Sequence, residues 1–553
     1  MLAAYVIASA SLAYLVKQLV YRQSHKITRD GKSLRSPPGT LPLFGNGLKF
    51  LLLDRQSLFD WFSKIQNEIF GFETYEIRVP TLPPGIVVSN PDVLEFIMKK
   101  EGSEGFGKGP FFEERSWHLF GHGIINASGQ LWKIQRKAGN KFFAGSHLQA
   151  LVDEVFPKFW EKARVELDEA AETGKIVDME ELYLEFTTRV MGRVAFGMDL
   201  SNSHPFSAAF DYASDLTGLR FQNPLWKINY YLFGQKFRKA VSIVKSFGNE
   251  IVRLAVCRRE NDDTSINNET EPTEKGGDLV DMLLDAVPEH HVVADSAINF
   301  LSAGRDTTAN SMTWVLHLLL EQPEFIPYIT DELPAAAVHT YSSLSTSLTP
   351  RSHAVFLETL RLYPPVPFEL KQTLNPAGMA LPDGTMLPPK SVVVWCPYAY
   401  GRSKKIWGDD AYDFKPNRWI ERTVLTDGIE EVKLKVKSAS EYPVFNGGAR
   451  SCLGRRMAEV MGVWVLGESL RNWEFEEVEK IGRRRSRNSL TLPMDGGLKV
   501  RKTALSELIY VVGYRHEVGY SSSVPNSLTE ITWTRQRRNN VIKDFRPSQK
   551  RTS

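Results

Sequence analysis

Cysteine is scarce in this chain, which carries only three in 553 residues: Cys257, Cys396 and Cys452. Three thiols cannot build a dense disulfide framework, so the composition favours a reducing compartment. The three are also too far apart in the sequence for a zinc or iron–sulfur cluster, whose cysteine ligands come at short spacings. Any metal site must therefore use a single cysteine, or histidine and carboxylate side chains.

An excess of charge of either sign is also missing. The 68 basic side chains nearly balance the 65 acidic ones, which leaves a net charge of +3. This balance gives no overall attraction to nucleic acid, and we expect no nucleic-acid partner. The composition, with 42% hydrophobic and 24% charged residues, is that of a globular protein.

One long apolar run lies near a terminus, at residues 1–21, where only Lys17 and Gln18 interrupt it. A membrane-spanning helix needs about 20 apolar residues, so the run is just long enough. Basic residues follow it, which by the positive-inside tendency places the rest of the chain in the cytoplasm. A cleaved signal peptide is the alternative, but its positive charge would precede the apolar run. We therefore expect a single-pass transmembrane anchor.

Four segments follow from the composition: the anchor at 1–21, a basic and proline-rich hinge at 22–39, a body at 40–502 and an extension at 503–553. Helical patterns dominate the body, strand-like patterns occur only in short stretches, and residues 259–278 form a polar linker. The body is therefore predicted to be one large α+β domain, mostly α with a small β part. The extension shows no strong periodicity and is expected to be disordered or loosely docked.

Cys452 stands in the segment Phe445-Asn-Gly-Gly448-Ala-Arg450-Ser-Cys452-Leu-Gly454. A single cysteine is usually a small buried apolar residue. The flanking glycines, however, let the backbone turn tightly and approach a large flat ligand. Such a loop can also direct N–H groups at the sulfur, and the helix predicted just after it favours an anionic thiolate. These features favour Cys452 as a metal ligand.

The pattern Phe-x-x-Gly-x-Arg-x-Cys-x-Gly resembles the haem-binding signature of the cytochrome P450 family, and every fixed position matches. The resemblance covers about residues 35–502. It implies the cytochrome P450 fold, a haem b cofactor and Cys452 as the axial ligand of the haem iron. Phe445, Arg450 and Gly454 would belong to the cofactor site.

Two further matches imply structural and haem-binding roles. Glu358 and Arg361, with Arg418 downstream, resemble the family's Glu-Arg-Arg triad, a buried carboxylate shared by two guanidiniums that stabilises the fold. Trp132 and Arg136 match the family's Trp-x-x-x-Arg, whose spacing puts both side chains on one helical face. Both can donate hydrogen bonds to a haem propionate. A core tryptophan beside a solvated arginine is the alternative.

Arg450 and Lys371 would complete the set of propionate donors. Lys371 stands where many family members have arginine. A lysine there supplies a point charge rather than a two-pronged guanidinium.

Residues 303–308, Ala-Gly-Arg-Asp-Thr-Thr, resemble the family's oxygen-activation motif inside an apolar helix. Small residues leave room above the iron. The hydroxyl of Thr307 could give up its bond to the preceding turn and open a local bulge that holds water. Asp306 would then relay protons to dioxygen, so both residues are predicted to be catalytic. The alternative for Asp306 is a salt bridge on the helix surface.

The resemblance implies a monooxygenase that inserts one oxygen atom of dioxygen into its substrate and releases the other as water. No flavin or nicotinamide site is evident, so electrons would come from a separate NADPH-cytochrome P450 reductase. Arg450, Arg455 and Arg456 are predicted to form its docking patch. A microsomal type of this family would lie in the endoplasmic reticulum membrane with the catalytic domain on the cytoplasmic face.

The segments 362–371 and 123–126 resemble plant and fungal branches that hydroxylate fatty acids and alkanes near the chain end. Fungal relatives also modify secondary metabolites. The predicted substrate is therefore hydrophobic: a long-chain fatty acid, or a polyketide- or terpenoid-like metabolite. Two alternatives stay open, namely a haem-thiolate isomerase or lyase that needs no reductase, and a non-catalytic haem-binding membrane protein. The chain departs from the family at residues 333–350 and after Lys502.

Overall fold

The computed structural model describes residues 26–504 apart from 80–81, 103–104, 265–277, 335–338, 426–427, 429 and 480–481. The predicted anchor at 1–21 lies outside the described residues, as does nearly all of the extension at 503–553. No helix within the described part of the chain is long and apolar enough to cross a membrane.

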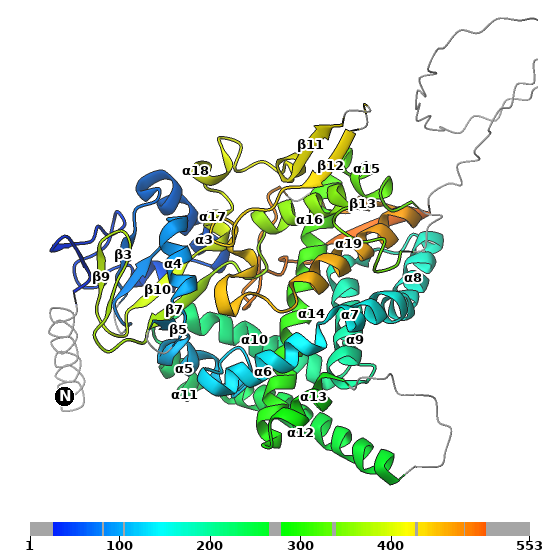
Figure 1. The fold of residues 1–553 in the computed structure, drawn as a ribbon, viewed down its shortest axis with the longest axis horizontal. Helices are drawn as coiled ribbons and strands as arrows, with labels where there is room; N and C mark the ends of the chain where they lie inside the picture. The colour runs from blue at the N-terminus through cyan, green and yellow to red at the C-terminus, as the bar shows by residue number, and fades with distance from the viewer. Residues whose placement is uncertain are drawn as a thin grey trace, which may run out of the picture. The chain divides into compact units, whose positions relative to one another are not determined.

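Helices make up most of the described body (Figure 1). They are α2 (Gly47–Leu52), α3 (Arg55–Lys64), α4 (Pro91–Lys99), α5 (Gly109–Phe120), α6 (Gly129–Phe142), α7 (Gly145–Ala150), α8 (Phe156–Thr173), α9 (Met179–Phe196), α10 (Pro205–Gln222), α11 (Trp226–Phe233), α12 (Gln235–Thr264), α13 (Leu279–Ala286), α14 (His290–Glu321), α15 (Pro327–Thr330), α16 (Pro350–Leu362), α17 (Pro397–Tyr400), α18 (Lys404–Trp407) and α19 (Arg455–Asn472).

The strands are short and form four small sheets. They are β1 (Thr28–Arg29), β2 (Lys32–Ser33), β3 (Tyr75–Ile77), β4 (Gly85–Val87), β5 (Phe106–Gly107), β6 (Val177–Asp178), β7 (Glu369–Thr373), β8 (Met379–Ala380), β9 (Thr385–Leu387), β10 (Val392–Trp395), β11 (Ile420–Val424), β12 (Glu430–Leu434), β13 (Trp473–Glu477) and β14 (Lys499–Ala504). The prediction of a mostly helical body with a small β part is therefore confirmed.

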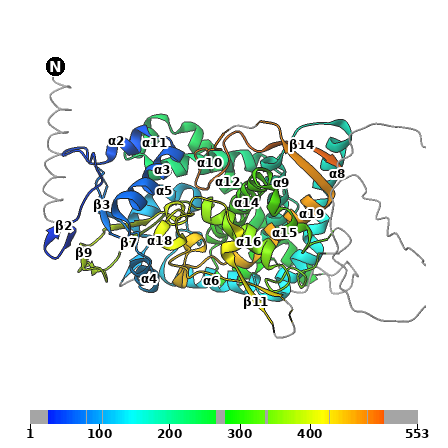
Figure 2. The ribbon, with the colours of Figure 1, turned by 90° about the horizontal axis from the view of Figure 1, so that it is seen from above.

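The largest sheet has the order β3-β4-β10-β7-β5, in which β10 pairs parallel with β4 and antiparallel with β7. The register places Lys371 of β7 opposite Val393 of β10. Figures 1 and 2 show this sheet at one side of the molecule and the long helices at the other. Strand β7 of this sheet thus places Lys371, one of the predicted site residues, next to the helical part.

Helix α14 passes through the middle of the helical part in both views (Figures 1 and 2). It packs against α9, α12, α16 and α19, and its apolar side chains are buried along nearly its whole length. Since apolar and polar side chains alike are buried on it, this helix belongs in the interior rather than on the surface. Its central turns, residues 303–308, therefore lie inside the protein.

The predicted polar linker at 259–278 begins too early. Helix α12 continues through Thr264, so residues 259–264 are helical and the prediction is wrong for them. Arg259 explains the extension, because its guanidinium forms ion pairs with Asp281 (3.0 Å) and Asp285 (2.9 Å) of α13. These ion pairs with α13 stabilise the last turns of α12, whose polar sequence does not by itself predict a helix.

Candidate active site

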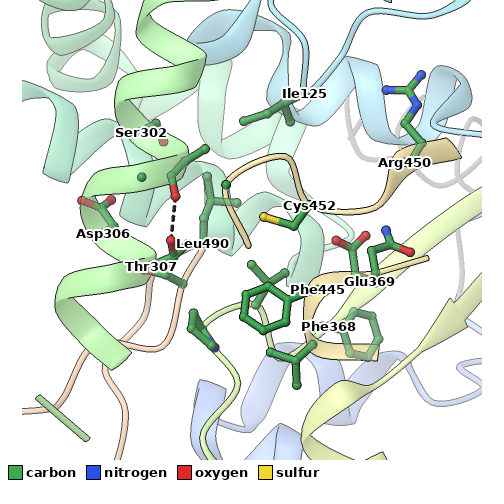
Figure 3. Close-up of a pocket in the computed structure, with 18 of the residues that line it drawn as sticks. Ile125, Ser302, Asp306, Thr307, Phe368, Glu369, Phe445, Arg450, Cys452 and Leu490 are labelled. Atoms are coloured by element: carbon green, nitrogen blue, oxygen red, sulfur yellow. Dashed lines mark hydrogen bonds between the residues drawn. The ribbon is translucent and has the colours of Figure 1, made fainter. Parts of the chain in front are cut away.

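A cavity of about 420 Å³ lies between α14, the loop before α19 and strand β7 (Figure 3). This volume is in the range of small-molecule sites. The cavity is lined mostly by apolar side chains. All of the predicted site residues line it, namely Trp132, Arg136, Asp306, Thr307, Lys371, Phe445, Arg450, Cys452 and Gly454. The structure thus brings together residues that are up to 322 positions apart in the sequence, as the span from Trp132 to Gly454 shows.

The loop that carries Cys452 is fixed by tight turns. The Cys452 N–H donates to the Phe445 carbonyl at 2.8 Å, which closes the loop on itself. Gly448 has a φ of +63°, and a Cβ there would overlap the Met98 carbonyl oxygen at the end of α4. A side chain at this position would be strained and would also push the loop off α4. The predicted requirement for glycine in a tight turn is confirmed here.

The sulfur of Cys452 points into the cavity (Figure 3). Burial raises the pKa of the Cys452 thiol above its ordinary value, while the Gly454 N–H and the Arg136 guanidinium act to lower it. The backbone N–H of Gly454 is the kind of donor that was predicted for this loop. Coordination to a metal ion deprotonates a thiol outright, which would override the effect of burial.

Thr307 lies across the cavity from Cys452, on the central turns of α14 (Figure 3). Ala303 and Gly304 line the same wall, so no bulky side chain from this turn fills the space. The Thr307 hydroxyl donates to the Ala303 carbonyl at 2.6 Å, and α14 is a regular α-helix from His290 to Glu321. The predicted bulge is therefore not seen, because the hydroxyl keeps its bond to the preceding turn.

Asp306 points away from Cys452, toward the other side of α14 (Figure 3). Its carboxylate forms an ion pair with Arg305 at 2.9 Å, and Arg305 also pairs with Asp211 of α10 at 2.5 Å. Arg305 and Asp306 are both buried, so the salt bridge is internal and the surface alternative is wrong. Burial raises the pKa of Asp306 to about 6, although the charge of Arg305 opposes this. A carboxyl group with a pKa near the working pH is suited to transfer protons.

Trp132 and Arg136 lie on one face of α6 and both line the cavity. Arg136 donates to the Ser451 carbonyl at 2.5 Å and to the Ser451 hydroxyl at 3.2 Å, next to Cys452. It has no carboxylate partner within 4 Å among the described residues. The Arg450 guanidinium lies over the Trp132 ring at 4.4 Å. The alternative of a solvated arginine is therefore wrong, because Arg136 faces the cavity.

Glu101 was not predicted, yet it joins two of the predicted cofactor-binding residues. Its Oε1 lies 2.5 Å from Lys371 Nζ and 3.3 Å from Arg450 Nε, and its side chain is buried. Burial and the neighbouring ammonium of Lys108 lower the pKa of Lys371 to about 8, while Glu101 acts in the opposite direction. The two cations therefore share one negative charge, and Lys371 is held by Glu101.

These residues fit an iron porphyrin. The cavity offers a single thiol, an apolar wall of small residues above it, and the indole N–H of Trp132 beside two guanidiniums. The observation that decides the fit is Arg136, a cation at the cavity wall whose charge no carboxylate in the described residues neutralises. An anionic propionate would supply that charge.

Glu358 forms the predicted triad in the core, away from the cavity. Its side chain is 0% exposed, and its two oxygens accept from Arg361 at 2.8 Å each. Arg418 Nε donates to Glu358 Oε1 at 2.9 Å, which confirms the predicted arrangement. The structure adds the Trp419 indole N–H at 2.9 Å and the Lys415 backbone N–H at 2.7 Å. The charge is thus both paired and fully hydrogen-bonded, as a buried carboxylate requires.

The predicted docking patch needs one correction. The Arg450 side chain is mostly buried and turned to Glu101 and the cavity, so it does not belong to a surface patch. Arg455 is more exposed and pairs with Glu459 at 2.9 Å, and Arg456 lies near the Tyr341 ring. Of the three arginines of the predicted patch, Arg455 and Arg456 remain candidates for contact with a partner.

Comparison with known proteins agrees with this site. The family model described as cytochrome P450 matches residues 35–498. Cytochrome P450 94A1 of Vicia sativa is 30% identical over 76% of this chain and 81% of its own length. Cytochrome P450 94B1 of Arabidopsis thaliana is 30% identical over 87% of the chain and 94% of its own length. A fungal relative, cytochrome P450 monooxygenase cyp1 of Mycosarcoma maydis, is 28% identical over 85% and 75% respectively.

Fold and site together define a haem-thiolate oxygenase. The chain belongs to the cytochrome P450 family. It is therefore an enzyme of the monooxygenase class with haem b as cofactor, which confirms both predictions. Members of this family generally use redox partners and hydrophobic substrates.

Proposed function

We propose that this protein is a membrane-bound monooxygenase that inserts one atom of dioxygen into a long-chain hydrophobic substrate. The substrate is a fatty acid, or a polyketide- or terpenoid-like metabolite, and the electrons come from NADPH-cytochrome P450 reductase. One observation carries the proposal: Cys452 and Thr307 face each other across an apolar cavity. A single thiolate ligand on one side and a hydroxyl with an acidic neighbour on the other are what oxygen activation requires.

The residues take the following roles in this proposal. Cys452 would hold the haem iron through its thiolate, whose electron donation would favour the oxygen chemistry that the haem supplies. Trp132, Arg136 and Arg450 would hold the propionates. Lys371 would contribute positive charge near the propionates, part of which Glu101 neutralises. Phe445 and Gly454 flank the sulfur and leave its approach to the cofactor free.

The cavity lining supports a long apolar substrate. Aromatic and aliphatic side chains from several distant elements form most of its wall, including Phe59, Phe112, Phe221, Phe300 and Leu490. Such a surface gains free energy when an alkyl chain leaves water, at about 25 cal/mol per Å² of buried area. NADPH consumption with reductase tests this, and we expect a rise when dodecanoate is added. No rise with any fatty acid or alkane would exclude the fatty-acid substrates and leave the polyketide- or terpenoid-like metabolites.

Thr307→Ala is expected to separate haem binding from oxygen use. The hydroxyl does not bind iron, so haem content should stay normal. Its loss should misdirect protons, lower product formed per NADPH and raise hydrogen peroxide release. The loss of a positioned proton-transfer group typically costs roughly 10²–10⁴-fold in rate, although solvent can bypass part of this. Product, NADPH and peroxide are measured in one assay.

Thr308→Ala is the control for this prediction, because Thr308 is the next residue on the same helix and is buried. If only Thr308→Ala uncouples the enzyme, the assignment on this helix is wrong by one residue. If neither variant does, the isomerase or lyase alternative, which needs no reductase, becomes the better account. The presence of the Asp306–Thr307 pair at the cavity supports the monooxygenase.

An apolar face of the body supports a location at the membrane. Leu48, Leu51 and Leu52 of α2 are exposed, and α11 exposes Leu232 and Phe233, the latter at 78%. The end of α10, just before α11, contacts the end of α2, because the side-chain amide of Gln222 donates to the Leu53 carbonyl at 2.7 Å. An apolar patch of this kind marks an interaction surface. We place it against the endoplasmic reticulum membrane, on the cytoplasmic side.

Deleting residues 1–21 is expected to shift part of the protein from the membrane fraction to the soluble fraction. The apolar face should retain the remainder, so Leu232→Ser with Phe233→Ser in the truncated chain should release it. Sedimentation of lysates with membranes measures both steps. Retention of the truncated and doubly substituted chain in the pellet would contradict this placement.

A further inference from the structure

Arg55 is a buried cation without a counter-charge at the cavity wall. It is the first residue of α3, it is 8% exposed and it lines the cavity. Its Nε has no hydrogen-bond partner, and its Nη1 makes a long contact of 3.4 Å with the Gly218 carbonyl of α10. No carboxylate of the described residues lies within 4 Å of it. Asp215 attracts it electrostatically but forms its own ion pair with Arg487 at 3.5 Å.

Burying the Arg55 guanidinium without a counter-charge costs free energy. A charge removed from water loses favourable solvation unless it is paired and hydrogen-bonded. Burial lowers the pKa of Arg55 to about 10, so the guanidinium is still charged at neutral pH. A buried donor that remains unsatisfied in a native protein calls for a functional explanation.

The other cations at this cavity are already engaged. Lys108 pairs with Glu369 at 3.7 Å, and Lys371 and Arg450 share Glu101. Arg136 binds Ser451 beside Cys452 and is assigned above to the cofactor. Among the described residues that line the cavity, Arg55 is thus the cation left for a substrate.

The surroundings of Arg55 indicate what kind of substrate group it receives. The Phe59 ring lies 5.1 Å from its guanidinium carbon, and Phe50, Leu58 and Phe221 line the same cavity. The contacts of Arg55 are with α3 and α10, and none is with the Cys452 loop or with α6. A ligand that reaches from Arg55 to Cys452 therefore combines one anionic end with an apolar remainder.

We propose that Arg55 binds the carboxylate of the substrate and so directs the opposite, apolar end of the chain toward Cys452. This inference rests on the proposed function, and within it selects the carboxylic acids among the hydrophobic substrates. A guanidinium in a dry site binds a carboxylate through two parallel hydrogen bonds, which fixes orientation as well as affinity. Arg55 is accordingly a specificity residue that touches the substrate far from the reacting carbon.

The test compares two ligands that differ only in charge. Dodecanoate and methyl dodecanoate are titrated into the haem-containing enzyme, and binding is followed by the change in haem absorbance and by calorimetry. The wild type should bind dodecanoate more tightly than the ester. Arg55→Gln should weaken dodecanoate binding roughly 10-fold or more, the usual effect of losing a charged hydrogen bond, and change ester binding less than about 2-fold. Arg55→Lys, which keeps the charge but not the two-pronged geometry, should lie in between.

Arg115→Gln is the matched control. Arg115 is also buried, also has an Nε without a partner, and does not line the cavity. Its substitution should leave the affinity for both ligands unchanged. Haem content and melting temperature are recorded for every variant, and Arg55→Gln should melt no lower than the wild type because it removes an unpaired buried charge.

Two results would overturn the inference and can be told apart from a failure of the proposed function. The first result is that the wild type binds the ester as tightly as the acid, or that Arg55→Gln weakens the binding of both ligands equally. Arg55 then does not bind the carboxylate, while the long-chain substrate class stands. If the wild type binds neither ligand, that substrate class fails and the role of Arg55 fails with it.

Discussion

Cys452→Ser is expected to abolish the thiolate signature of the reduced, carbon-monoxide-treated protein and to eliminate product formation. A hydroxyl supplies no anionic sulfur to the iron, so the electron donation that favours O–O cleavage is lost. The loop should keep its shape in the variant, because Cys452 holds it through its backbone N–H to Phe445. The absorbance difference spectrum measures the change directly, and haem content is determined on the same sample.

Cys396→Ser and Cys257→Ser are the controls for this substitution. Cys396 is fully buried against the Pro367 carbonyl, and burial raises its thiol pKa to about 12, so it is a poor thiolate ligand. Cys257 is exposed on α12. Both variants should keep the thiolate spectrum. A thiolate spectrum that survives in Cys452→Ser would contradict the assignment and point to one of these two cysteines.

Glu358→Gln is expected to destabilise the fold by about 3–5 kcal/mol, the usual cost of leaving buried charges without their partner. The substitution leaves the fully buried guanidinium of Arg361 facing a neutral amide, while Arg418, which is 12% exposed, keeps its ion pair with Asp410 at 3.3 Å. Chemical unfolding of the haem-containing protein measures the loss, and the yield of folded protein should fall with it.

Glu430→Gln is the matched control, because Glu430 pairs with Arg422 at 3.2 Å on the surface of the β11–β12 hairpin. An exposed pair of this kind contributes about 0–1 kcal/mol. If Glu358→Gln costs no more than Glu430→Gln, the triad does not stabilise the fold.

Local patterns made much of the site predictable. The Cys452 loop, the Trp132–Arg136 pair and the turn that carries Thr307 are each encoded within about ten consecutive residues, so spacing alone places their side chains together. The Glu358–Arg361 pair is local as well, and its downstream Arg418 was predicted because the family resemblance supplied the connection. The structure agrees with each of these groupings.

Contacts between distant segments were not predictable in this way. Glu101 reaches Lys371 across 270 positions, and Arg305 pairs with Asp211 across 94. Nothing in the sequence near Glu101 distinguishes it from a surface carboxylate. Arg305 did carry a signal, because an arginine inside an otherwise apolar helix must have a partner, but that partner could not be named. Arg55 was the hardest to predict, because its proposed partner is a ligand and not a residue of the chain.

The proposed monooxygenase activity can be tested by following the oxygen atom from dioxygen into the product. The enzyme is incubated with NADPH, reductase, dodecanoate and dioxygen that carries a heavy isotope, and the products are analysed by mass spectrometry. We expect a hydroxylated acid with one heavy oxygen in the new hydroxyl, near the end of the chain opposite the carboxylate, formed only when NADPH and reductase are present. A product whose new oxygen comes from water, or that forms equally well without reductase, would show that the protein is not a reductase-dependent monooxygenase.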